Sequence, residues 1–94
     1  MTFTELKTSL NSQAPPAGIN DLVMALWYDA KGDWNRAHEI VQDLSSRDAA
    51  WIHAYLHRKE GDLGNASYWY NRAHQNMPSV SLEEEWGSIV EALL

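Results

Sequence analysis

The pattern of hydrophobic and polar positions divides the chain into six segments with helical periodicity. Within each segment apolar residues recur every three or four positions, as on the buried face of an amphipathic helix. Short stretches rich in Gly, Pro, Asp or Ser separate the segments and favour turns. The predicted helices cover residues 3–11, 19–31, 33–45, 48–60, 62–77 and 81–94.

Two of the predicted turns share one set of signals. Gly32 and Gly61 supply the left-handed residue that ends a helix, and Asp33 and Asp62 follow them as typical N-caps. Helices joined by such short turns return antiparallel to each other. The sequence therefore predicts two helical hairpins, residues 19–45 and 48–77.

The first and last segments carry different signals. Thr4 is the predicted cap of the first helix, and Pro15-Pro16 marks a linker after it. Pro78 is predicted to stop the fifth helix. Ser81 begins a capping box at the sixth, where the acidic run of residues 83–85 is best explained by the positive end of the helix dipole.

The two hairpins repeat at a spacing of 29 residues, which is the distance from Gly32 to Gly61. The same shift places Ala37 on Ala66, so turn, cap and buried face all agree. A second apparent repeat, the tetrapeptide NRAH at residues 35–38 and 71–74, needs a shift of 36 that leaves the turns unmatched. We interpret the NRAH repeat as a coincidence.

The hairpins resemble tetratricopeptide-repeat (TPR) units, although their 29-residue period is shorter than the usual 34. The resemblance rests on Ala25, Gly32-Asp33, Trp34 and Ala37 in the first unit and on Ala54, Gly61-Asp62, Leu63, Ala66, Ala73 and Pro78 in the second. It implies an all-α fold, with antiparallel helical hairpins in a short TPR-like right-handed superhelix. The predicted single domain, 1–94, comprises an N-terminal segment and Pro-rich linker (1–18), the two hairpins (19–45 and 48–77) and a C-terminal capping helix (81–94).

Composition narrows the classes of partner. The formal net charge is −6 and the seven basic residues are scattered, which disfavours nucleic acid and anionic membranes. The chain contains no cysteine, as is usual in a reducing compartment, and shows neither a signal peptide nor a long apolar run. We expect a cytoplasmic protein that needs no cofactor.

The TPR resemblance also implies an interaction surface. In that family the first helices of the units form a concave face that receives a peptide or a partner helix. The residues on this face would be Leu22, Leu26, Trp51, Tyr55, Arg58 and Lys59. Aromatic residues with Arg are typical of binding hot spots. An equally weighted alternative places Trp51 and Tyr55 under a terminal segment, and self-association is a further way to occupy the face.

Evidence for catalysis is thin, because the chain has no glycine-rich phosphate loop and its serines lie in loops or caps. The main expectation is therefore a non-catalytic protein-interaction module. The alternative is a small-ligand or metal-binding protein built on His53 and His57, which lie one turn apart on a helix. Further donors would come from Glu60, Asp62 or His74, while the simpler interpretation is a pair of histidines hydrogen-bonded inside the hairpin.

Overall fold

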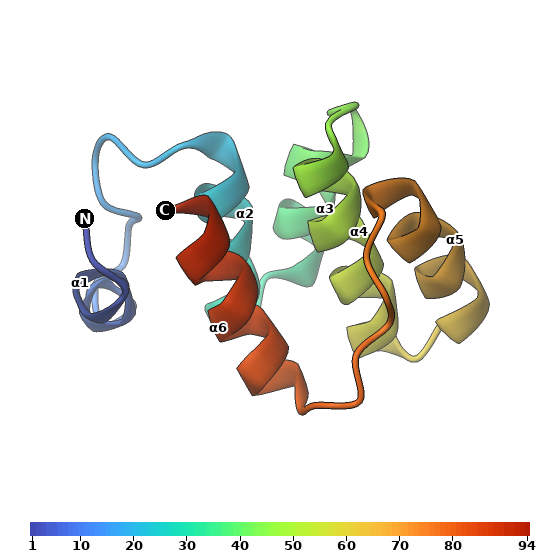
Figure 1. Ribbon diagram of the computed structural model, residues 1–94. Helices are drawn as coiled ribbons and strands as arrows, with labels where there is room; N and C mark the ends of the chain where they lie inside the picture. The colour runs from blue at the N-terminus through green and yellow to red at the C-terminus, as the bar shows by residue number, and fades with distance from the viewer.

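The computed structural model describes residues 1–94 and is entirely α-helical, as predicted. Figure 1 shows the six helices, with long connections between α1 and α2 and between α5 and α6. They are α1 (Phe3–Ser9), α2 (Asp21–Ala30), α3 (Trp34–Gln42), α4 (Arg47–Glu60), α5 (Leu63–Ala73) and α6 (Leu82–Leu93). None of them is long and apolar enough to cross a membrane.

The turn signals of the two hairpins are confirmed. Gly32 and Gly61 have φ values of +88° and +89°, in the left-handed region where a residue with a Cβ would be strained. The side chains of Asp33 and Asp62 accept hydrogen bonds from backbone N–H groups of the following helix, as N-caps do. The repeated Gly-Asp pair therefore has the same structural function in both turns.

Several predicted boundaries were wrong, and the third helix, for one, ends at Gln42 instead of residue 45. Thr2, not Thr4, caps α1, because Thr2 and Glu5 form a reciprocal capping box. The fifth helix ends before Pro78: its cap is His74, which adopts the left-handed conformation at φ 57°. The N–H groups of His74 and Gln75 bond back to the carbonyls of Asn71 and Tyr70, which closes the helix.

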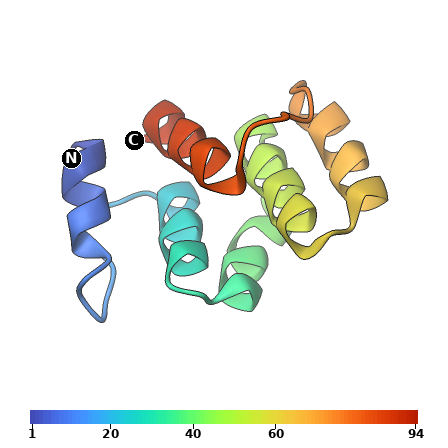
Figure 2. The same ribbon diagram turned by 90° about the horizontal axis from the view of Figure 1, so that it is seen from below.

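The two hairpins, α2–α3 and α4–α5, lie side by side with α3 packed against α4. Helix α1 lies at one end of the molecule and α5 at the other, as Figure 1 and Figure 2 both show. The α1 helix is attached through the buried Leu6 and through Ser9, which accepts a hydrogen bond from the Trp27 indole.

The last helix lies in a different place from the one expected of a helix that caps the end of a repeat array. Helix α6 crosses α2 and α4 (Figure 2) instead of stacking on α5. Its apolar residues Ile89 and Val90 are completely buried, and the Trp86 indole donates a 2.9 Å hydrogen bond to the carbonyl of Leu26. The main core of the protein is a buried apolar cluster that includes Val23 and Leu26 of α2 and Ile52 and Leu56 of α4. Helix α6 completes it by covering the inner face of the two hairpins, which α2 and α4 form.

Candidate functional site

The predicted partner-binding face lies on α2 and α4, and α6 covers most of it. The expectation that these residues await a partner is corrected for Leu26 and Tyr55, which are buried in the main core. Leu22 and Trp51 are half-buried and pack against the same core. Tyr55 thus shares the main core with residues of α6, as the alternative placed it, whereas Trp51 also packs against a smaller cluster that includes Tyr70 of α5.

Tyr55 and Lys59 converge on a buried carboxylate from the other hairpin. The Tyr55 hydroxyl donates to Asp29 Oδ2 at 2.9 Å, and Lys59 Nζ donates to Asp29 Oδ1 at 2.9 Å. Asp29 is only 2% exposed, so both of its oxygens depend on these partners. Burial, together with the Asp29 charge, raises the pKa of the Tyr55 hydroxyl, which stays protonated as a donor.

Arg58 belongs to a second network of the same kind. Arg58 Nη1 donates to Glu85 Oε1 at 2.8 Å, and the Tyr70 hydroxyl donates to Glu85 Oε2 at 2.6 Å. Arg58 also donates to the carbonyl of Val80, in the loop before α6. Burial and the hydrogen bond to Glu85 raise the pKa of the Tyr70 hydroxyl. Glu85 therefore holds α6 to α4 and α5, a role that the helix-dipole interpretation of residues 83–85 did not predict.

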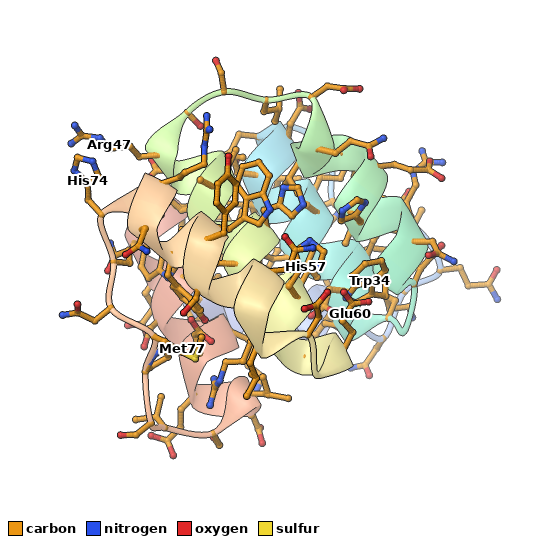
Figure 3. All side chains as sticks on the ribbon, turned by 90° about the vertical axis from the view of Figure 1, so that its right-hand side faces the viewer. Trp34, Arg47, His57, Glu60, His74 and Met77 are labelled. Carbon is orange, nitrogen blue, oxygen red and sulfur yellow. The ribbon has the colours of Figure 1, made fainter.

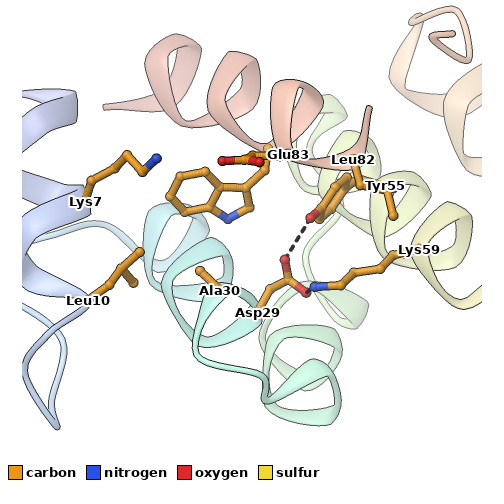
Figure 4. Close-up of a pocket in the computed structure, with 9 residues that line it drawn as sticks. Lys7, Leu10, Asp29, Ala30, Tyr55, Lys59, Leu82 and Glu83 are labelled. Atoms are coloured by element: carbon orange, nitrogen blue, oxygen red, sulfur yellow. Dashed lines mark hydrogen bonds and ion pairs between the residues drawn. The ribbon is translucent and has the colours of Figure 1, made fainter. Parts of the chain in front are cut away.

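The uncovered remainder of the predicted face is a hollow of about 280 Å³ between α1, α2, α4 and α6 (Figure 4). Tyr55 and Lys59 remain part of its wall. The other lining residues are Lys7, Leu10, Asp29, Ala30, Leu82, Glu83 and Trp86. Helices α1 and α6, which were not part of the predicted face, thus supply much of the lining of the hollow.

The second candidate site is a cluster of three histidines on the opposite side of α4. His53 and His57 lie one turn apart on α4, and His38 reaches them from α3. Nε2 of His38 lies 3.0 Å from Nε2 of His53. One side-chain nitrogen from each residue can be chosen so that all three lie within 4.8 Å of one another. The cluster therefore places three imidazole donors around one point.

Aromatic and acidic side chains surround this cluster. Trp34 stacks on His38 and Trp69 stacks on His53, with ring centroids 4.9 and 3.9 Å apart. Glu60 Oε1 lies 2.6 Å from Nδ1 of His57. Figure 3 shows Trp34, His57 and Glu60 next to one another on the right of the view and His74 at its left edge.

The environment keeps two of the imidazoles neutral at neutral pH. Burial lowers the pKa of His53 to about 4, with further contributions from His38 and His57. Burial and the neighbouring His57 also lower the pKa of His38. Since a neutral imidazole carries a free lone pair, both residues are in the form that binds a metal ion.

The structure brings some of the predicted donors to this site and leaves others outside it. Glu60 and Asp62 each have a carboxylate oxygen within 4.8 Å of a nitrogen of His57, although Asp62 also serves as the N-cap of α5. His74 caps the end of α5, is exposed and is not among the clustered residues. His38 was missed, because it belongs to the NRAH repeat that we interpreted as a coincidence. The sequence did contain a signal for His38. Trp34 and His38 lie one turn apart on a helix that packs antiparallel to the helix that carries His53 and His57.

Comparison with known protein families, with curated proteins and with solved structures finds no match to this chain.

Proposed function

We propose that this protein is a non-catalytic interaction module of two TPR-like hairpins that receives one apolar side chain of a peptide or protein partner. The observation that supports this function is the hollow of about 280 Å³ at the uncovered part of the α2–α4 face. It lies on the face where the TPR resemblance places a ligand. In this proposal α6 takes most of the space that a longer partner helix would fill.

The walls of the hollow suit an apolar anchor. Leu10, Ala30, Leu82 and Trp86 supply apolar surface between its polar residues. Asp29 offers little to a polar ligand, because it is only 2% exposed and each of its oxygens already accepts a hydrogen bond from within the chain. At about 280 Å³ the hollow lies at the lower end of the roughly 300–1,000 Å³ usual for ligand pockets, so it offers room for one large side chain but not for a longer segment.

The hollow carries exposed charges of both signs, Lys7 and Glu83, which favour an anchor with a charged neighbour. Lys7 is exposed and lies on the wall, where its ammonium group packs 5.8 Å from the centroid of the Phe3 ring. A carboxylate next to the anchor residue would pair with Lys7, whereas Lys59 is already paired with Asp29. Such a contact at the rim affects selectivity and association rate more than affinity.

A peptide library displayed on phage tests this proposal. We expect selection on the intact protein to enrich peptides with one large apolar residue beside a charged one. Ala30→Trp fills the hollow from an exposed wall position and should abolish their binding, whereas Ala92→Trp, at an exposed position on α6 outside the hollow, should not.

Equal binding of the selected peptides to A30W and to the unmodified protein would contradict the proposal. Light scattering over a range of concentrations tests self-association through the same hollow. In that case the unmodified protein forms a dimer, and A30W converts it to a monomer.

A further inference from the structure

We propose that His38, His53 and His57 bind one divalent transition-metal ion of the zinc class. This site lies between α3 and α4, apart from the hollow, and does not depend on the interaction function. It joins the His53–His57 pair to a third residue, His38, that the linear sequence places far from them.

The distances suit an ion at the centre of the cluster. In a tetrahedral site with Zn–N bonds of 2.0–2.1 Å, neighbouring nitrogens lie about 3.4 Å apart. The His38 and His53 Nε2 atoms are 3.0 Å apart, and the candidate nitrogens of all three residues lie within 4.8 Å of one another. The candidate nitrogens of the three rings therefore lie close enough together for one ion to be shared among them.

The donor set determines the class of ion. Three imidazole nitrogens without a thiolate suit Zn²⁺, Co²⁺, Ni²⁺ or Cu²⁺, whereas Mg²⁺ and Ca²⁺ require oxygen donors. The cluster supplies three protein ligands, which leaves a fourth coordination position for water or another small ligand. Binding replaces the His38–His53 hydrogen bond by two metal–nitrogen bonds, and the proton that donates this bond moves to the other nitrogen of its ring or leaves to solvent.

The surroundings resemble the outer shell that metal sites require. Metal-binding histidines usually donate their other ring N–H to a carboxylate or carbonyl, which fixes the tautomer. Glu60 is placed to accept such a bond from Nδ1 of His57, at 2.6 Å, and the lone pair of Nε2 is then left for the metal ion. The stacked Trp34 and Trp69 rings restrict the orientations of His38 and His53.

The site is also accessible. His53 and His57 are buried, but His38 is half-buried and Glu60 is exposed. An ion therefore reaches the cluster from the solvent at the half-buried His38 and the exposed Glu60.

Titration of the full chain with metal tests the proposal directly. After treatment with EDTA and dialysis, the protein is titrated with Zn²⁺ in a calorimeter and with Co²⁺ in a spectrophotometer. We expect one ion per chain, a Co²⁺ visible spectrum typical of four-coordinate nitrogen ligation, and a melting temperature that rises with Zn²⁺ concentration.

Variants assign the ligands. His38→Gln should weaken Zn²⁺ binding by roughly 100-fold or more, and Glu60→Gln, which changes only the outer shell, by roughly tenfold. His74→Gln is the matched control, since it removes an exposed histidine outside the cluster, and its affinity should equal that of the unmodified protein.

NMR of the unmodified protein gives an assignment that does not depend on how any variant folds. Zn²⁺ should shift the ring nitrogen signals of His38, His53 and His57 and leave those of His74 unchanged. The proposal is overturned by the absence of saturable binding at micromolar Zn²⁺, by wild-type affinity in H38Q, or by shifts confined to His74.

Discussion

The two faces of α4 use polar residues in opposite ways. On the face toward α2 and α6, Tyr55, Arg58 and Lys59 satisfy two buried carboxylates. On the face toward α3 and α5, His53 and His57 meet other aromatic rings and a third imidazole. The first face contains paired ions, whereas the second brings three imidazole rings together.

This difference follows from the cost of burial. A carboxylate taken out of water needs a cation or several donors, so Asp29 and Glu85 commit the residues around them to holding the fold. An imidazole can become neutral instead, and it then needs only one hydrogen bond to be tolerated. Tyr55, Arg58 and Lys59, which look like a binding surface in the sequence, therefore hold the fold together, and Tyr55 and Lys59 also line the hollow.

The largest effect is expected at Glu85, on the ionic face. Glu85→Gln should lower the free energy of unfolding by about 3–5 kcal/mol, because it leaves the Arg58 charge without its buried partner. Urea unfolding measures the loss. Glu91→Gln on the exposed side of α6 is the control and should change stability by less than about 0.5 kcal/mol. A similar small change in E85Q would show that this ion pair does not hold α6.

Acid should act next most strongly, through the histidine face. The pKa of His53 falls from an ordinary 6.5 to about 4, so the unfolded chain takes up a proton more readily than the folded one between these values. The associated stability is fully present above pH 6.5 and is lost as the pH falls toward 4, by about 3 kcal/mol at most.

Urea unfolding at several pH values in EDTA measures this effect. Carboxylates also titrate in acid, so the readout is the difference in pH dependence between the unmodified protein and His53→Gln. We expect a shallower slope in H53Q and an unchanged slope in His74→Gln. Parallel slopes in all three proteins would contradict the buried, neutral state of His53.

Tyr55→Phe should have a smaller effect than the loss of Glu85. The substitution removes one donor to Asp29 but leaves the Lys59 pair in place, so we expect a loss of about 1–2 kcal/mol. Tyr68→Phe is the matched control, because Tyr68 is 52% exposed. Thermal or urea unfolding measures the stability of both variants. Equal losses of stability would contradict the role of the hydrogen bond from Tyr55 to Asp29.

The smallest expected change is a gain, at a position outside both faces. His74→Gly should stabilise the protein by roughly 0.5–1 kcal/mol, since glycine adopts the left-handed cap conformation without strain. His38→Gly, in the other copy of NRAH, should instead destabilise it, because that position lies within α3 and stacks on Trp34. Urea midpoints that move in the same direction would remove this distinction between the two copies.

The helices and their turns were largely predictable from the sequence, because caps and left-handed glycines act over a few residues. Asp33, Asp62, Gly32 and Gly61 all have the predicted conformations or contacts. The end of α5 was not predictable from Pro78, because a non-glycine residue, His74, took the left-handed conformation first.

The sites were less predictable, because they depend on which helix covers which face. The pattern of α6 predicted an apolar face but not that it would lie against α2 and α4. The acidic run at the start of α6 likewise gave no sign that Glu85 is buried, because its burial depends on contacts with Arg58 and Tyr70 from other helices. His38 joined the other two histidines only through the packing of α3 on α4.

The position of α6 also gives the molecule an order of assembly. Each hairpin can form from contacts between neighbouring segments, whereas the bond from Trp86 to Leu26 joins residues 60 positions apart. Until α6 has been synthesised, the inner faces of α2 and α4 have no cover, and Asp29 and Arg58 lie beside apolar surface exposed to water. We therefore expect nascent chains without α6 to depend on chaperones, and truncation before Ser81 to yield an aggregation-prone pair of hairpins.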